Sequence, residues 1–406
     1  MSTPTSPPHD ATHVEQPKVS SLKKFAAGSR GVIRAYPSAT RIVSITLLTF
    51  LAILATFYIS DTQNPAIGEG AAVAVAVLGL TWLTGWSGQV SLGNSGFMMV
   101  GAYTASLWIN HHPSATQPSS YGIGLVLAVA VGAVTGLILG LPATRLRGPY
   151  LAGMTIAFAV VIPSFIQTLS FAGGSGGLQV FALTPPQWFV NFFNDQEYGY
   201  QIANAQWPTD IVIAIAGFSF LIMANLFHSK LGRSMRMVRD NDVAAELAGI
   251  NLPRMRALAF VISASFGALG GALFIYIANT ITPEEPFQFT FGITLLTLMV
   301  VGGIGTLWGA AIAGVVFAYQ GPWIAWLSSH VGISSTTNLG QQMPNILFSG
   351  ILILTMLLAP RGIVGGIQDL VRIVKKLLAS SASRSETSPE SPSDNASGDA
   401  ATHSPS

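Results

Sequence analysis

Residues 232–274 read GRSMRMVRDNDVAAELAGINLPRMRALAFVISASFGALGGALF, and they place a polar, basic stretch directly before a long apolar one. The apolar run at 255–279 exceeds the about 20 apolar residues that cross the hydrocarbon core of a bilayer as a helix. The preceding stretch includes Arg233, Arg236 and Arg239, whose charges are costly to bury in lipid. The sequence here therefore predicts a polar loop outside the membrane that leads into a membrane-spanning helix.

The composition of the whole chain also indicates a lipid environment. Half of the 406 residues are hydrophobic and only 9% are charged, whereas soluble proteins usually carry about 25% charged residues. The chain has no cysteine, which excludes disulfides, thiolate chemistry and cysteine-ligated metals. A net charge of +2 is too small to indicate a nucleic-acid partner.

Ten apolar runs are long enough to enter the membrane, so we expect an all-α polytopic membrane protein with about ten transmembrane or re-entrant helices. The runs are 42–59, 66–84, 90–110, 121–141, 149–172, 209–228, 255–279, 287–303, 304–320 and 343–359. They define a transmembrane domain at 41–365, between a disordered tail at 1–40 and a C-terminal segment at 366–406. From about residue 380 this segment is rich in Ser and Pro, has little to bury and is expected to be disordered.

The basic residues are gathered in four regions of this map. All 19 Lys and Arg residues lie before the first run, between the fourth and fifth, between the sixth and seventh, or after the last. Ten crossings bring these regions to one face of the membrane, and the positive-inside rule makes that face cytoplasmic. We therefore expect both termini and a loop at 229–253 in the cytoplasm, and a loop at 173–208 outside.

The stretch 287–320 is compatible with one long helix or with two shorter ones. A single crossing would put Arg361, Lys375 and Lys376 outside, whereas two crossings, or a re-entrant pair, keep them inside. The Gly-Gly-Ile-Gly sequence at 302–305 supplies a flexible turn. The sequence therefore predicts a reversal of the chain on the cytoplasmic side at these residues.

Ionisable groups are absent from the centres of the expected spans, and Glu69 and Asp210 lie near span ends. Proton-coupled carriers usually need buried ionisable groups, so this class is disfavoured. A sodium-coupled carrier built on carbonyls and hydroxyls, or a passive channel, remains open. His111 and His112 are interpreted as ordinary loop residues rather than metal ligands. The chain has neither a catalytic set nor the phosphate-binding G-x-x-x-x-G-K-[ST] loop, so another subunit must hydrolyse any ATP that drives it.

Several glycines recur at helical spacing within the expected spans. They are Gly132, Gly136 and Gly140, then Gly267 and Gly271, then Gly305 and Gly309. Small residues on one face let helix backbones approach closely. These faces could line a translocation path or a subunit interface, but tight packing inside one subunit is the favoured interpretation.

The loop at 229–253 carries the signals of a short amphipathic helix. Asp240 or Asn241 can cap its start, with Asp242 in the first turn, and Gly249 can end it. One apolar stripe is expected from the side chains of Val243, Leu247 and Ile250. Such a helix can dock in a groove on a cytoplasmic partner, or it can lie against the membrane or its own spans.

Residues 232–274 resemble the coupling loop and following helix of branched-chain amino acid ABC transporter permeases. The loop shares the Glu-Ala-Ala…Gly pattern of ABC importers through Ala244, Ala245, Gly249 and Pro253, although Val243 replaces the first acid and the spacing after Gly249 is shorter. Further similar stretches are GWSGQVSLGNSGFMMVGAYTASL (85–107), RLRGPYLAGMTIAFAVVI (145–162), FAGGSGGL (171–178), MVVGGIGTLWGAAIAGVVF (299–317) and APRGIVG (359–365). Together they resemble most closely the longer, second permease subunit of this family.

The resemblance implies a permease subunit that moves a small solute by alternating access and performs no bond chemistry itself. It implies a homologous permease partner, two cytoplasmic ATPases that use ATP and Mg²⁺, and a binding protein outside, with no cofactor bound by this chain. The docking residues it implies lie between Asp240 and Pro253. Branched-chain amino acids are the expected substrate, with urea or short-chain amides as the alternative. A stand-alone carrier or channel and an intramembrane enzyme are the competing classes.

Overall fold

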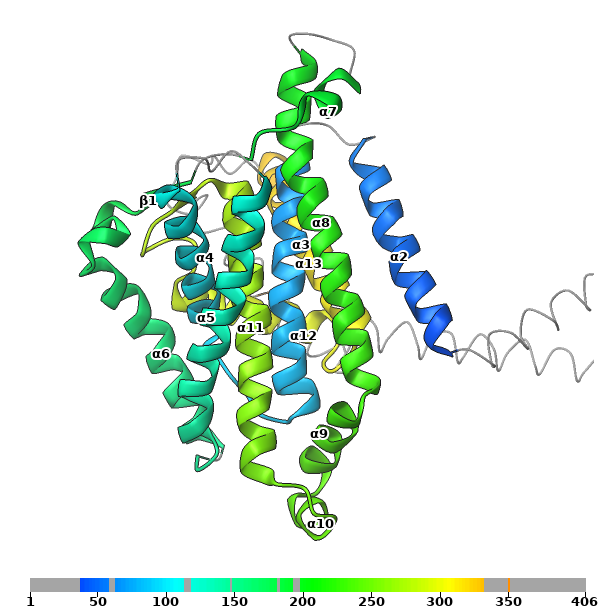
Figure 1. Ribbon diagram of the computed structural model, residues 1–406, viewed down its shortest axis with the longest axis vertical. Coiled ribbons are helices and arrows are strands. Elements are labelled where there is room, and N and C mark those ends of the chain that lie inside the picture. Colours follow the sequence, from blue (N-terminus) through cyan, green and yellow to red (C-terminus); the bar gives the residue numbers. More distant parts are fainter. Residues whose placement is uncertain are drawn as a thin grey trace, which may run out of the picture.

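The computed structural model shows a bundle of helices with short connections (Figure 1). The structure describes residues 37–57, 63–112, 118–146, 148–180, 183–192, 198–331 and 350. The expected tails at 1–40 and 366–406 therefore lie outside the described residues, apart from the start of the first helix. The expected run at 343–359 is also outside them, except for residue 350.

The other nine expected runs each overlap a helix. The helices are α2 (Pro37–Thr56), α3 (Asn64–Leu80), α4 (Asn94–His111), α5 (Pro118–Ala143), α6 (Pro149–Gln167), α7 (Gln187–Phe192), α8 (Tyr198–His228), α9 (Lys230–Asp240), α10 (Asp242–Leu247), α11 (Leu252–Ala278), α12 (Phe289–Gly302) and α13 (Leu307–Val331). A π-helical segment, η1 (Thr81–Trp86), continues α3. Two short 3-10 turns, η2 (Ser170–Ala172) and η3 (Gly174–Gly176), follow α6.

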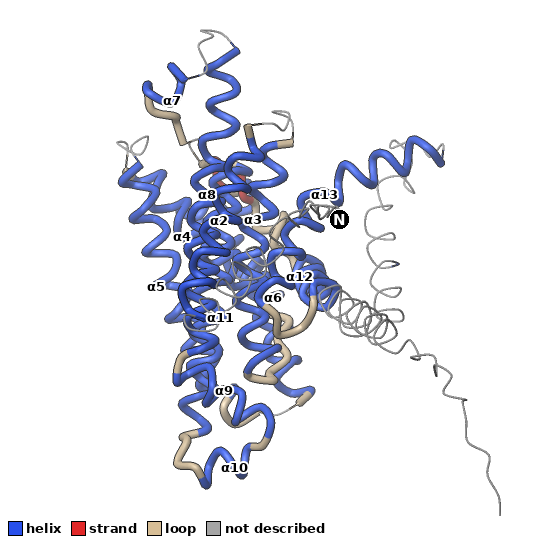
Figure 2. Tube along the Cα trace, turned by 90° about the vertical axis from the view of Figure 1, so that its right-hand side faces the viewer, coloured by secondary structure: helices blue, strands red, loops and turns tan. Residues whose placement is uncertain are grey.

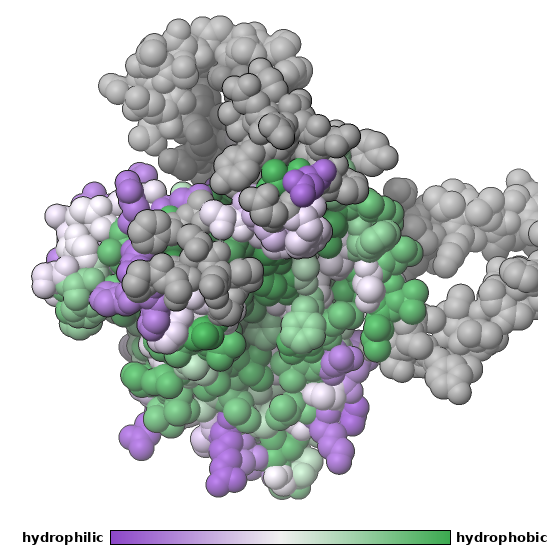
Figure 3. Space-filling view, turned by 45° about the horizontal axis from the view of Figure 1, so that its top comes forward, coloured by the Kyte–Doolittle hydropathy of each residue, from purple (hydrophilic) through white to green (hydrophobic). Residues whose placement is uncertain are grey.

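Five helices among the described residues are long and apolar enough to cross a membrane, namely α3 with η1, α5, α6, α8 and α11. Apolar parts of α2, α12 and α13 are shorter. Figure 3 shows a broad hydrophobic surface on the face in view, with hydrophilic side chains towards its edges. Exposed apolar side chains on α5 and α6 include Val126, Val134, Ile138, Val160 and Phe165. A surface of this kind suits lipid rather than water.

Helix α11 lies at the centre of the bundle and packs against α3, α4 and α5. Its neighbour α4 is also mostly buried. Its polar side chains, which include Asn94, Ser95 and Ser106, therefore face the interior of the bundle rather than lipid. His111 forms the last residue of α4, so it belongs to a helix rather than to the expected loop. In contrast, most of α5 and α6 is not buried, as expected for helices at the periphery.

Helix α2 is held to α8 by a few polar contacts at the C-terminal end of α2. The hydroxyl of Thr56 donates a hydrogen bond to the carboxylate of Asp210 over 2.8 Å. The amide of Gln206 donates to the Thr56 carbonyl over 3.1 Å. Asp210 therefore has a hydrogen-bonding partner within the bundle.

The chain reverses between α12 and α13, where the sequence predicts a turn. Residues 303–306 connect the two helices, and both Gly303 (φ 123°) and Gly305 (φ 76°) adopt backbone conformations that side-chain-bearing residues rarely take. The stretch 287–320 therefore forms two helices rather than one. The side of the membrane on which this turn lies stays a prediction.

The region 173–208 is more structured than the expected loop. Strand β1 (Leu178–Gln179) pairs antiparallel with β2 (Thr280–Ile281), which follows α11. Helix α8 begins at Tyr198 rather than at 209, because the helix continues through Pro208. Figures 1 and 2 place α7 at one end of the molecule and α9 and α10 at the other.

Candidate functional site

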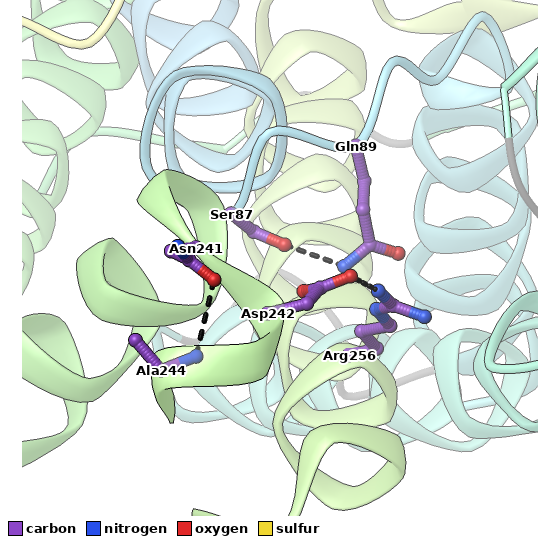
Figure 4. Close-up of polar contacts among 6 residues, drawn as sticks. All are labelled: Ser87, Gln89, Asn241, Asp242, Ala244 and Arg256. Atoms are coloured by element: carbon purple, nitrogen blue, oxygen red, sulfur yellow. Dashed lines mark hydrogen bonds and ion pairs between the residues drawn. The ribbon is translucent and has the colours of Figure 1, made fainter. Parts of the chain in front are cut away.

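The loop at 229–253 folds as two short helices, α9 and α10, that lead into α11. Each turn between them is closed by an asparagine. The side chain of Asn241 accepts a hydrogen bond from the Ala244 N–H over 3.1 Å (Figure 4), and Asn251 accepts one from Arg254 over 3.1 Å. Of the two expected caps, Asn241 starts α10, whereas Asp240 ends α9. Because both corners are capped, the segment is a defined structure rather than a loose connection.

Gly249 lies just beyond the end of α10, where the sequence predicts a helix stop. Its φ of +80° is a left-handed conformation, which glycine adopts without the clash that a side chain would bring. The N–H of Ile250 donates to the Ala245 carbonyl over 3.0 Å, so it satisfies a carbonyl at the helix end. Pro253 follows in the first turn of α11, where its missing N–H costs little.

The expected apolar stripe of α10 is divided in the folded protein. Val243 and Leu247 are 66% and 85% exposed. Ile250 instead packs against the hydrophobic core of the bundle, and Ala245 is completely buried. Side chains beyond the end of α10 and on its inner face therefore attach it to the bundle, while two large apolar side chains remain available on its outside.

The start of α10 is also joined to α11 by an ion pair. The carboxylate of Asp242 accepts a hydrogen bond from the Arg256 guanidinium over 2.5 Å (Figure 4). Next to it, the Gln89 amide donates to the Ser87 hydroxyl over 2.5 Å. These side chains line a cavity of about 720 Å³ between α10, the start of α6 and the connection that precedes α4. This ion pair could not be predicted from the sequence, because Asp242 and Arg256 lie on different helices.

Two of the arginines in this segment contact η1. The guanidinium of Arg236 lies 4.1 Å from the ring centre of Trp86, and Arg239 donates to the Gly85 carbonyl. Sequence reasoning assigned no role to Trp86, although Gly85 and Trp86 begin the family-like stretch 85–107.

The glycines of α5 and α11 lie at contacts inside this subunit. A Cβ at Gly136 would lie 2.6 Å from the Ala264 Cβ of α11, and Gly132 and Gly140 also face α11. Gly267 and Gly271 of α11 face α4, and Gly309 faces the α12–α13 turn. The sequence placed Gly305 on the same helix face as Gly309. That expectation is wrong, because Gly305 lies in the turn before α13.

The fold is a bundle of apolar helices with an apolar outer surface, and it carries a capped, polar two-helix segment at one end. These features define a multi-pass membrane protein. Residues 66–359 match the family described as the branched-chain amino acid transport system permease component, and the chain belongs to this family. No solved structure matches it.

Several relatives carry names from this transport system. The LivM permease protein of Salmonella typhimurium is 28% identical over 322 residues, which cover 74% of this chain and 73% of that protein. LivM of Escherichia coli is 30% identical over 258 residues, which cover 59% of this chain and 58% of that protein. LivH of Salmonella typhimurium, also a permease protein of high-affinity branched-chain amino acid transport, is 25% identical over 73% of this chain and 92% of its own length.

Proposed function

We propose that this chain is one permease subunit of an ATP-binding-cassette importer in the cytoplasmic or inner membrane, and that its substrates are branched-chain amino acids. It forms half of a translocation path with a homologous permease and works by alternating access. Two cytoplasmic subunits bind and hydrolyse ATP with Mg²⁺, and a binding protein outside delivers the solute. The observation that carries this proposal is the pair of exposed apolar side chains on α10 in a member of this permease family.

Helix α10 has the properties of a docking element. Val243 and Leu247 are exposed at an end of the bundle that also carries basic side chains, including Arg233. An exposed apolar pair on a short helix can enter a groove on a partner protein. The Asn251 cap defines the corner between α10 and α11, and the Asp242–Arg256 ion pair joins the two helices, so a push on α10 reaches the central helix of the bundle. We therefore assign the cytoplasmic ATPase subunits to this surface.

The opposite end of the bundle is assigned to the outside. The four basic regions of the sequence lie together in the cytoplasm only if the end of the bundle that carries α9 and α10 is the cytoplasmic end. In this arrangement the paired strands β1 and β2 and helix α7 face the binding protein, and the two termini are cytoplasmic. The glycines between α5, α11 and α4 then allow close helix packing inside this subunit. The translocation path itself lies between this subunit and the second permease.

Reconstitution in lipid vesicles tests the proposal. The chain would be incorporated alone, and then together with the second permease and the ATPases of the same importer, with ATP enclosed and the binding protein outside. We expect the complete assembly to accumulate leucine and the chain alone to accumulate nothing. Accumulation of urea or acetamide instead of leucine would overturn the substrate. Solute movement by the chain alone would overturn the permease-subunit assignment in favour of a carrier or channel.

A further inference from the structure

Trp86 ends the π-helical segment that continues α3. π-Helical turns are rare, and they occur frequently at functional sites. The Trp86 side chain is buried, with 9% of its surface exposed. Its ring touches parts of the chain that are far apart in sequence, so its neighbours show what this unusual turn positions.

One side of Trp86 faces the segment that leads to α10. Its ring stacks on Phe227 at the end of α8, with ring centres 4.2 Å apart and planes 5° apart. Arg236 of α9 lies over the Trp86 ring, where a cation is attracted to the aromatic face. Next to it, Arg239 of α9 donates to the carbonyl of Gly85. Two side chains of α9 therefore hold the end of η1.

Another side of Trp86 faces the α12–α13 turn. The indole N–H of Trp86 donates to the Gly305 carbonyl over 3.0 Å. The backbones also meet closely, because a Cβ at Gly85 would lie 2.5 Å from the Gly305 Cα. The turn itself contains Gly303 and Gly305 at positive φ. Residues of this kind can absorb large backbone rotations when neighbouring helices move.

Gly85 and Trp86 thus lie between α9 and the α12–α13 turn, with defined contacts to both. We propose that they are positioning residues that transmit movement of the α9–α10 segment to the α12–α13 turn, and so couple ATPase docking to the opening of the path. The inference rests on the proposed function, since it names the route by which this site would act. Arg236 and Arg239 hold the first link of the route, and the Trp86–Gly305 hydrogen bond forms the second.

Trp82 provides a matched control within the same π-helical turn. It is completely buried, and its ring centre lies 6.2 Å from that of Trp86 and 5.8 Å from that of Phe227. Its indole nitrogen has no hydrogen-bond partner among the described residues. Trp82→Phe therefore removes a comparable volume from the same stack without removing a link to the turn, whereas Trp86→Phe removes the link to Gly305.

The test uses the complete importer in vesicles, with a fluorescent label on the permease. The chain has no native cysteine, so a single cysteine at Ile304, which is 47% exposed in the turn, can be labelled before assembly. In the unmodified assembly we expect ATP to change the label's signal. In Trp86→Phe we expect assembly and ATP hydrolysis to persist, while the label no longer responds to ATP. The amount of leucine transported per ATP should fall about tenfold, which is within the range of ordinary coupling free energies.

Arg236 and Arg233 provide a second matched pair on the exposed side of α9, where substitutions should not prevent folding. Arg236→Gln removes the cation above Trp86 and is expected to lower transport per ATP in the same direction. Arg233 instead donates to the His228 carbonyl at the end of α8, so Arg233→Gln should leave coupling unchanged.

Specific outcomes would overturn the inference. One is a Trp86→Phe variant whose label response and leucine transported per ATP are both unaltered. The other is an equal loss of these two quantities in Trp86→Phe and Trp82→Phe, which would indicate that the tryptophans act through packing alone. The proposed function fails separately: if the unmodified assembly transports no leucine but its label still follows ATP and loses this response in Trp86→Phe, the substrate is wrong and the transmission route stands.

Discussion

The carboxylate of Asp242 and the guanidinium of Arg256 lie 2.5 Å apart, and they join the first turn of α10 to the start of α11. Both side chains are partly shielded, with exposures of 33% and 13% respectively. The α10 segment therefore has a polar attachment to the central helix in addition to its buried Ala245. This relationship makes the orientation of α10 depend on a pair that can be removed by one substitution.

Replacing Asp242 with Asn should weaken binding of the ATPase subunits while the permease remains folded. A partly exposed ion pair contributes only about 1 kcal/mol or less to stability, so the melting temperature should change little. The orientation of α10 should be less restricted, and affinity for the ATPases, measured by titration in detergent, should fall. Glu284→Gln removes an exposed acid between β2 and α12, outside the docking segment, and serves as the control. Equal affinities for Asp242→Asn and the original chain would contradict the prediction.

Gly249 provides a test of the helix stop. Valine at its φ of +80° is strained by about 1–3 kcal/mol, although a Cβ there would meet no neighbouring atom within 4 Å. Gly249→Val should therefore weaken ATPase association while membrane insertion stays normal. Asparagine tolerates left-handed backbone better, so Gly249→Asn should have a smaller effect. Co-purification of the ATPases at the original level with Gly249→Val would count against the assignment of this segment.

Leu247 tests the docking surface directly. Because it is 85% exposed, Leu247→Ser should leave the thermal stability of the isolated permease within about 0.5 kcal/mol. If Leu247 enters a groove on an ATPase, the same substitution should lower ATPase affinity and ATP-driven transport together. Thr144→Ser, a small change at a half-exposed residue just after α5, should alter neither quantity. Unchanged affinity in Leu247→Ser would place the docking surface elsewhere.

Gly136 tests the close contact between α5 and α11. A Cβ there would lie 2.6 Å from the Ala264 Cβ and 2.8 Å from the Phe260 carbonyl oxygen. Gly136→Ala should therefore destabilise the permease by about 1–3 kcal/mol, measured as a lower unfolding temperature in detergent. Gly153 of α6 has no atom within 4 Å of a Cβ, so Gly153→Ala is a matched control that should not be destabilising. The reverse order of stabilities would be incompatible with the packing described.

Single cysteines test the orientation of the chain in the membrane. Ser175 lies in η3 near β1, and Ser234 lies on α9 at the other end of the molecule. In intact cells we expect a membrane-impermeant thiol reagent to label Ser175→Cys but not Ser234→Cys. Both should be labelled after the membrane is opened. Labelling of Ser234→Cys alone in intact cells would reverse the orientation and exclude cytoplasmic ATPases from α10.

Much of the membrane architecture follows from local sequence. Runs of apolar residues give helices, since a backbone in lipid must satisfy its hydrogen bonds within the segment. Glycines at 302–305 indicate the turn between α12 and α13, and the polar stretch before α11 indicates a short capped helix. Caps and turns depend on backbone conformations that single residues favour, so Asn241 and Gly249 are recognisable before any tertiary contact is known.

The contacts that define the candidate site depend instead on how distant segments meet. The sequence does not predict that Asp242 meets Arg256 or that Trp86 meets Gly305, because the partners lie on separate segments and their side chains give no periodic signal. It also does not show that Ile250 packs inward while Leu247 points outward, since periodicity identifies an apolar face but not what covers it. Hydrophobicity and positive charge thus determine which segments enter the membrane, whereas steric fit between helices determines which residues connect its moving parts.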